Sequence, residues 1–173
     1  MKKYLFILLA AVAFVACSND DLTHENTIAP IADKKIGTEI KTFFESELSD
    51  SLPDGRNKFG LDAERNIEPL VVPYVDCRLI NSREELEGQY KGEKEIPQID
   101  FSAYSLVIGK VIVMWKDWTM RLEMQEEDDF LKLTAYLHDK HGGTTWDTLS
   151  FDYFWNLYPK LPSKPLQPWF SED

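Results

Sequence analysis

The chain has 173 residues, of which 30 are acidic and 19 are basic, so its formal net charge is −11 at pH 7. An acidic surface of this strength repels nucleic acid and anionic lipid headgroups, which excludes nucleic acid as an expected partner. Hydrophobic residues make up 43% of the chain and aromatic residues 13%, so the chain can bury a core and is not a disordered polypeptide.

The N-terminal end has the pattern of a secretory signal. Two lysines precede an apolar segment, residues 4–16, which is too short to span a bilayer and ends directly before Cys17. With Ala16 before the cysteine, this segment resembles a bacterial lipoprotein signal. The resemblance implies that Cys17 is lipidated and becomes the mature N-terminus. The alternative is an ordinary cleaved signal peptide with an incidental cysteine.

The residues after Cys17 bear on where such a lipoprotein would reside. Ser18, rather than Asp, is similar to signals for sorting to the outer membrane, and the acidic pair Asp20-Asp21 is similar to the surface-export tags of Bacteroidetes lipoproteins. The resemblance therefore implies a lipid-anchored protein of the outer membrane, on its periplasmic or surface-exposed face. Removal of residues 1–16 would leave 157 residues with a net charge near −13.

Three parts are predicted along the chain. Residues 1–16 are the signal peptide, and residues 17–35 are a lipidated flexible tether because they are polar and show no hydrophobic period. Residues 36–173 form a single α+β domain. Its first element is an amphipathic helix over residues 36–48, in which apolar side chains recur at helical spacing.

The middle of the chain predicts two strands and a second helix. Residues 67–80 are apolar but contain two prolines, which is typical of an edge or irregular strand. Cys77 in this run is expected to be a buried structural thiol, because nothing in the flanking sequence would activate a nucleophile. Ser82 and Glu85 form a capping box for a helix that ends near Tyr90. Residues 104–115 are apolar on both faces, as in a central strand that is covered on both sides.

Three later segments alternate between apolar and polar residues, and they begin near residues 118, 131 and 149. Alternation with period two predicts antiparallel strands with one buried and one wet face. We therefore predict an antiparallel β-meander of about four to six strands, packed on one face by short helices.

A second resemblance covers residues 80–106, a helix introduced by serine and followed by the strand entry PQIDFS. The segment is similar to one that recurs in small uncharacterised Bacteroidetes lipoproteins. It is distantly similar to the C-terminal domain type of envelope protease-complex subunits, a family that supplies no catalytic residues. The resemblance implies a protease-regulating domain as one possible function.

Metal-binding and catalytic patterns in the sequence are weak. His138 and His141 have a spacing that could hold a cation, with Asp139 and Asp147 nearby, but Cys77 and His24 do not complete four ligands, and a solvated loop explains the pair as well. The acidic run 126–129 could attract calcium, yet it lacks the glycine and alternating oxygens of a calcium loop, so a charged turn is favoured. No hydrolase motif or phosphate loop is present, which predicts neither enzyme activity nor a cofactor.

The remaining candidates are binding residues. Trp118 and Trp155 lie on apolar strand faces and are predicted core residues, whereas Trp146 and Trp169 fall in a loop and in the Pro-rich tail and could stack on sugar rings. The predicted wet face of the sheet carries further candidates for ligand binding or, alternatively, for cross-strand charge pairing that keeps the protein soluble. These are Arg121, Glu123, Lys132, Tyr136 and Asp152.

The sequence therefore predicts a non-catalytic binding or interaction module of the cell envelope. Its possible ligand-binding residues are Trp146, Trp169, Arg121 and Tyr136, and its partners are the membrane through Cys17 and a glycan or an envelope protein. The alternatives are an envelope hydrolase without a recognisable motif and the protease-regulating domain.

Overall fold

The computed structural model describes residues 26–61, 73–114, 117–140 and 150–172. Cys17, His24, His141, Trp146 and Asp147 lie outside these residues, as do the predicted signal peptide and the first part of the tether.

The chain folds into two helices and seven strands in two sheets, which confirms the α+β class. The elements in chain order are β1 (Thr27–Ile28), a 3-10 turn (Asp33–Lys35), α1 (Thr38–Glu47), β2 (Tyr74–Ile80), α2 (Arg83–Gln89), β3 (Tyr104–Val113), β4 (Trp118–Glu126), β5 (Leu131–Asp139), β6 (Ser150–Pro159) and β7 (Leu166–Glu172).

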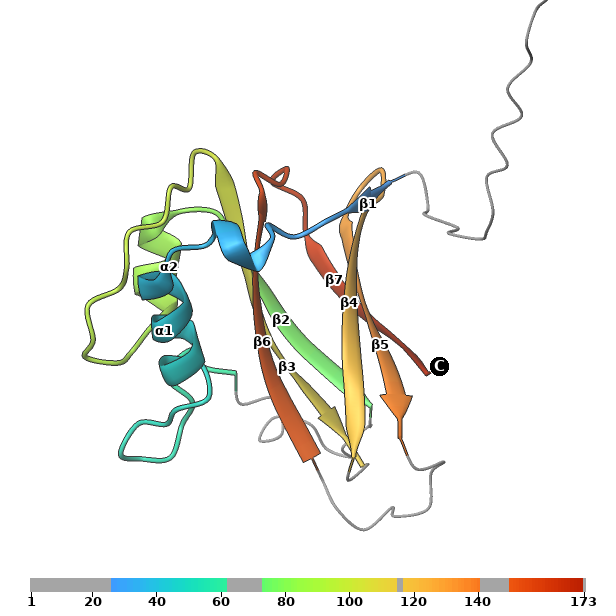
Figure 1. Ribbon diagram of the computed structural model, residues 1–173, viewed down its shortest axis with the longest axis horizontal. Coiled ribbons are helices and arrows are strands. Elements are labelled where there is room, and N and C mark those ends of the chain that lie inside the picture. Colours follow the sequence, from blue (N-terminus) through green and yellow to red (C-terminus); the bar gives the residue numbers. More distant parts are fainter. Residues whose placement is uncertain (1–25, 62–72, 115–116, 141–149, 173) are drawn as a thin grey trace, which may run out of the picture.

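The elements form three layers (Figure 1). An antiparallel three-stranded sheet has the order β2-β3-β6, and it packs face to face with a four-stranded sheet of the order β1-β4-β5-β7. The four-stranded sheet is mixed. Strand β7 runs parallel to β5, whereas β1 with β4 and β4 with β5 pair antiparallel. Both helices cover the face of the three-stranded sheet that points away from the four-stranded sheet.

The prediction of a single meander is wrong. The strands β4 and β5 do form a hairpin, but β6 pairs with β3 in the other sheet, and the helices pack on that sheet. The reason is that the second half of β6, residues 154–158, is covered on both faces. Phe154 and Tyr158, on the side that the alternation assigned to polar residues, are buried between the two sheets. Leu157, on the opposite side, packs into the core beneath the helices.

The strand β3 is the central strand that the sequence predicts. All its residues from Ser105 to Val113 are buried, since the helices cover one face and the four-stranded sheet covers the other. Gly109 is required where β3 passes Phe154. A Cβ atom at this position would lie 2.2 Å from the Phe154 ring and 2.6 Å from the Asp76 carbonyl oxygen.

The helical layer is joined to the sheet by a cluster of aromatic rings. Phe44 of α1 is 1% exposed and stacks on Trp155 of β6 with ring centroids 5.0 Å apart. Phe59 and Tyr90 complete the cluster around Phe43. Predicted core positions are thus confirmed for Trp155 and also for Trp118, which packs between the sheets.

The capping box of α2 is present with one change. The Ser82 hydroxyl accepts a hydrogen bond from the Glu85 amide at 3.1 Å, as predicted. The Glu85 carboxylate reaches back one residue further than expected and accepts from the Asn81 amide at 2.6 Å. Two amide donors near the N-terminus of this short helix are thereby satisfied.

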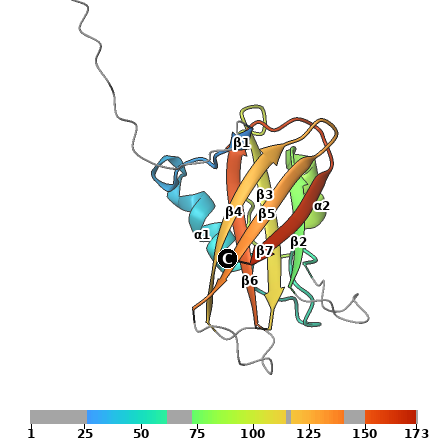
Figure 2. The same cartoon turned by 90° about the vertical axis from the view of Figure 1, so that its right-hand side faces the viewer.

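Residues 27–35, the last part of the predicted tether, are folded onto the domain. Thr27 and Ile28 pair with Gln125 and Met124 at the edge of β4. The Ile31 amide then donates to the Leu157 carbonyl on β6 at 2.7 Å. This N-terminal segment therefore links the four-stranded sheet to the three-stranded sheet (Figure 2). No helix in the described part of the chain is both long and apolar enough to cross a membrane.

Candidate functional site

Within the described ranges, one sheet face is covered neither by the helices nor by the other sheet. In β5, Leu131, Leu133, Ala135 and Leu137 are fully buried against the three-stranded sheet, so the residues between them point to the opposite side. We call that side of the four-stranded sheet the outer face. By register it carries Thr119, Arg121, Glu123 and Gln125 of β4, Lys132, Thr134, Tyr136 and His138 of β5, and Gln167, Trp169 and Ser171 of β7.

Among the described residues, Trp169 is the most exposed large hydrophobic side chain on the outer face. It lies beside Thr134 in the parallel pairing of β7 with β5, and half of its surface, 50%, is exposed. The Lys132 ammonium lies 5.2 Å from the centroid of its ring. The next residue, Phe170, is nearly as exposed at 47%, but it pairs with Ala135 and points to the other side of the sheet.

A second pair of a cation and an aromatic ring lies across β4 and β5. The Arg121 guanidinium sits 4.0 Å from the centroid of the Tyr136 ring, and these two residues are direct cross-strand neighbours. Glu123 holds the arginine through an ion pair of 3.1 Å. The Glu123 carboxylate also accepts hydrogen bonds from Gln125 at 2.7 Å and from Thr27 at 3.5 Å.

The structure therefore brings three of the four predicted ligand-binding residues, Arg121, Tyr136 and Trp169, onto one face. The fourth, Trp146, lies outside the described residues. Lys132 and Glu123 share the outer face as the alternation predicts, but Asp152 does not, because β6 belongs to the other sheet. Strand β7 was missed: its Pro168 and its adjacent aromatic residues hide the alternation that would have indicated a strand.

A buried ionic network on the opposite side of the molecule was also missed by the sequence analysis. Glu47 at the end of α1 is 1% exposed. Its carboxylate contacts the ammonium groups of Lys58 at 2.7 Å and Lys94 at 2.6 Å, and accepts a hydrogen bond from the Tyr90 hydroxyl at 2.6 Å. A signal was available, because Glu47 interrupts the apolar stripe of α1 next to Leu48.

This network is structural rather than catalytic. Burial alone would raise the pKa of Glu47, but the bonds from Lys58, Lys94 and Tyr90 outweigh burial and lower the pKa from 4.5 to about 2. The carboxylate is thus permanently charged near neutral pH and both its oxygens are bonded. A general acid or base needs a pKa nearer the working pH and access to a substrate, so Glu47 suits neither role.

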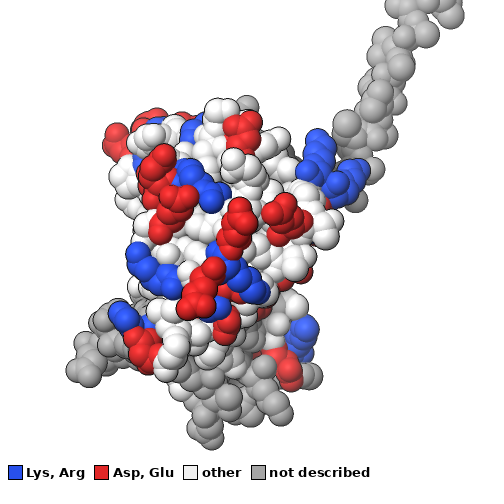
Figure 3. Space-filling model, turned by 90° about the vertical axis from the view of Figure 1, so that its left-hand side faces the viewer, with Lys and Arg blue, Asp and Glu red and all other residues white. Residues whose placement is uncertain are grey.

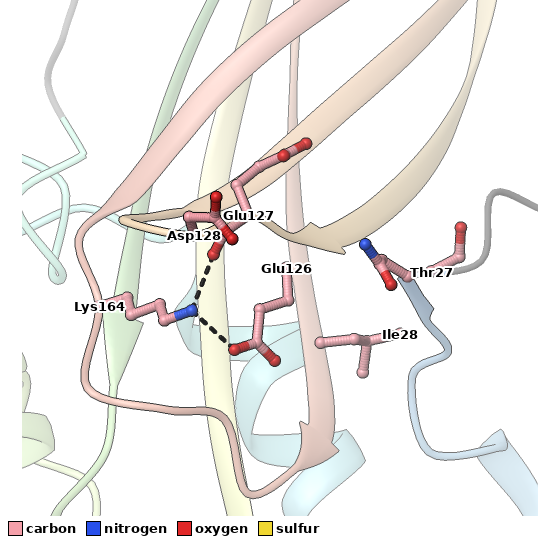
Figure 4. A pocket seen from close by; sticks show the side chains of 7 residues that line it. Thr27, Ile28, Glu126, Glu127, Asp128 and Lys164 are labelled. Atoms are coloured by element: carbon pink, nitrogen blue, oxygen red, sulfur yellow. Dashed lines mark hydrogen bonds and ion pairs between the residues drawn. The ribbon is translucent and has the colours of Figure 1, made fainter.

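The acidic turn after β4 is closed by a lysine (Figure 4). The Lys164 ammonium donates to the Glu126 carboxylate and to the Glu127 carbonyl oxygen, both at 2.7 Å. These groups line a surface pocket of about 420 Å³ together with Asp128 and residues 26–28. The turn therefore already contains a cation from the protein itself, and the predicted charged turn between β4 and β5 is what the structure shows.

The predicted metal site is only partly described. His138 and Asp139 lie at the end of β5, while His141 and Asp147 are outside the described residues. Within the described ranges, no three His, Cys, Asp or Glu side chains are grouped so that they could hold a metal ion.

Cys77 is half-buried at the margin of the core between the sheets, somewhat more exposed than expected. Burial, and then the negative charge of Asp76, raise the pKa of its thiol from 9.0 to about 12. The thiolate is therefore scarce at neutral pH, and the residue is not set up as a nucleophile.

Comparison of the chain with protein-family models, with curated proteins and with solved structures found no match in any of the three. The candidate site is a polar sheet face that carries a half-exposed tryptophan and two cations that lie over aromatic rings.

Proposed function

We propose that the domain is a non-catalytic carbohydrate-binding module and that the outer face is its binding surface. The observation that carries the proposal is Trp169, which is half exposed on an otherwise polar sheet face. An exposed indole ring costs solvation free energy, and it offers a rigid apolar surface for a ligand. The C–H face of a sugar ring fits such a surface, and its hydroxyl groups can pair with the surrounding polar side chains.

The composition of the outer face favours a glycan over a protein partner. The buried centre of a protein–protein interface is apolar and contains few charges. Around Trp169 the outer face instead carries Lys132 and Tyr136 of β5 and Gln167 and Ser171 of β7, with Arg121 opposite Tyr136 on β4. Every one of these side chains can donate a hydrogen bond, as the recognition of sugar hydroxyls requires.

The outer face supports binding rather than cleavage of a glycan. Hydrolysis of a glycosidic bond ordinarily uses two carboxyl groups on opposite sides of the scissile bond. Among the described residues, the outer face contains one carboxylate, that of Glu123, and three donors already bind it. This argues against the alternative of an envelope hydrolase at this site.

The proposal includes attachment to the outer membrane through a lipid on Cys17. It is supported by the lipoprotein-like sequence before the cysteine. The substitution Cys17→Ala should move the protein from the membrane fraction to the soluble envelope fraction. Digestion of the wild-type domain by protease added to intact cells would indicate surface display, and complete protection would contradict it.

The binding proposal is tested with an array of neutral and acidic oligosaccharides, followed by calorimetric titration of the best ligand. Trp169→Ala should weaken binding by about tenfold or more, because stacking on the ring is lost. The matched control is Phe170→Ala, which removes an equally exposed ring from the neighbouring position on the other side of the sheet and should leave affinity unchanged.

Thermal unfolding of both variants shows that the comparison is made between folded proteins. Absence of binding to every oligosaccharide on the array would refute the proposal. Equal affinities for the wild type and Trp169→Ala would also refute it, since the binding surface would then lie elsewhere.

A further inference from the structure

We infer that the outer face selects acidic oligosaccharides, and that Lys132 and Arg121 bind the ligand's carboxylates while Trp169 stacks on a sugar ring. This inference rests on the proposed function, because it specifies which carbohydrates the outer face binds. It assigns to Lys132 a specific role, the binding of a ligand carboxylate.

The charge of the outer face is opposite in sign to that of the whole chain. The chain has a formal net charge of −11, so a random surface would be acidic. Among the described residues of the outer face, Arg121 and Lys132 are cations and Glu123 is the single carboxylate. A positive area on an acidic protein favours an anionic ligand, since the remaining surface repels it and the outer face attracts it.

The register shows that these cations are not placed for cross-strand charge pairing. Such pairing would set an acidic residue directly opposite each cation. Lys132 instead lies between Gln125 on β4 and Gln167 on β7, and Arg121 lies opposite Tyr136. In the described part of the chain, the Lys132 ammonium contacts the Trp169 ring, and no carboxylate binds it.

Each cation is therefore held in place yet able to bind an anion. The Trp169 ring orients Lys132 from one side, which leaves the other donors of the ammonium for a ligand. Arg121 is oriented by Tyr136 and Glu123, and its side chain remains 62% exposed. A guanidinium has five N–H donors, and one of its nitrogens makes the ion pair with Glu123.

The two cations are spaced for an extended ligand. The Arg121 guanidinium packs on the ring of Tyr136. Tyr136 and Lys132 are four residues apart on the same face of β5, which corresponds to roughly 13 Å along the strand. Trp169 lies beside Thr134, between them. A ligand that stacks on Trp169 and has carboxylates toward both ends would contact all three groups, so an acidic oligosaccharide fits better than a single acidic sugar.

The test uses matched pairs of ligands on the full domain. Tetragalacturonate, an alginate oligosaccharide and a hyaluronate oligosaccharide are each titrated beside a carboxyl-reduced form of the same chain. At least one acidic form should bind about tenfold or more tightly than its reduced counterpart, as expected for a charge-assisted contact. Raising the salt concentration should weaken binding of the acidic form alone.

The variants separate the two levels of the proposal. Lys132→Gln should remove most of the preference for the acidic form, with little effect on the reduced form, whereas Trp169→Ala should weaken both. Lys34→Gln is the matched control, because Lys34 is an exposed lysine on the 3-10 turn, outside the four-stranded sheet, and it should change neither affinity.

If neutral oligosaccharides bind through Trp169 as tightly as the acidic ones, the inference is overturned and the proposed function stands. If the acidic forms are preferred but Lys132→Gln keeps that preference in full, the role assigned to Lys132 is overturned. If none of the oligosaccharides binds, both the proposed carbohydrate binding and the inferred preference for acidic ligands are contradicted.

Discussion

The two sheets share one core between them but differ in what lies on their other faces. The three-stranded sheet is covered by α1, α2 and their flanking loops, and this side contains the aromatic cluster and the Glu47 network. In the part of the chain that the structure describes, no element packs on the outer face of the four-stranded sheet, and Trp169 there is half exposed. The same architecture thus uses one sheet face for stability and leaves the other as the surface that we propose binds a ligand.

Charged groups show the same difference. On the helical side, acidic and basic side chains lie next to one another (Figure 3). The buried Glu47 is bound by two lysines, and Lys58 is shared with Asp50 at 2.7 Å. On the outer face, Lys132 lies against the Trp169 ring with no carboxylate bound to it among the described residues, and Arg121 packs on the Tyr136 ring and pairs with Glu123 of its own strand. The buried carboxylate on the helical side is therefore bound by two cations, whereas the side proposed to bind keeps one cation, Lys132, without a carboxylate among the described residues.

The largest effect on stability is expected from Phe44→Ala on the helical side. Phe44 is 1% exposed and stacks on Trp155, so its removal leaves a cavity between α1 and β6. Loss of a buried phenylalanine costs about 3–5 kcal/mol of unfolding free energy. Urea denaturation followed by tryptophan fluorescence measures this loss. A cost under about 1 kcal/mol would mean that the helical layer contributes little to the fold.

A smaller loss is expected from Glu47→Gln. The amide keeps the shape but not the charge, and it leaves Lys58, whose side chain is 15% exposed, with Asp50 as its remaining acidic partner. We expect a cost of about 2–3 kcal/mol, at the lower end for a broken buried ion pair, because Lys94 is well solvated. Glu45→Gln, on the exposed side of α1, is the control and should change stability little.

The same carboxylate predicts a pH dependence. The pKa of Glu47 is about 2 in the folded protein and has its ordinary value of 4.5 in the unfolded chain, so the unfolded chain takes up the proton first as pH falls. The stability that Glu47 contributes is therefore complete above pH 4.5 and is lost between pH 4.5 and about 2. In denaturation experiments at a series of pH values, the unfolding free energy of the wild type should approach that of Glu47→Gln as the pH falls through this window. A constant difference between them would contradict the role of the charge.

The smallest effect on stability is expected from Trp169→Ala, although it is the variant with the largest expected effect on binding. Half of the ring is already exposed, so the loss should stay below about 1 kcal/mol, including the contact with Lys132. Thermal unfolding of Trp169→Ala, with Phe170→Ala measured in parallel, gives this loss of stability. A loss above about 2 kcal/mol would show that the ring stabilises the fold, and the contrast between the two faces would disappear.

Part of this architecture was predictable because the signals are local. The stripe of α1, the two-faced apolar run of β3 and the alternation of β4 and β5 each follow from side-chain periodicity. The choice of strand partner does not. Alternation shows which face of β6 is apolar in the sequence, but Phe154 and Tyr158 acquire their buried environment only when β6 pairs with β3.

The candidate site was predictable to the same extent. Arg121 and Tyr136 could be placed on a wet face by alternation alone. Trp169 could be named as an exposed ring, but its position beside them depends on the parallel pairing of β7 with β5, which no local pattern indicates. Glu47 had a local signal, and its partners Lys58 and Lys94 come from segments that only the folded chain brings together.

The short pairing of β1 has a mechanical consequence. It joins β4 through Thr27 and Ile28, and the next attachment is the Ile31 bond to Leu157. If Cys17 is anchored in a membrane and a ligand is bound to the outer face, as we propose, a pulling force between the two would load these few bonds in succession. The attachment of residues 27–31 consists of far fewer bonds than the pairing of β3 with β6, so we expect it to open before the sheets do.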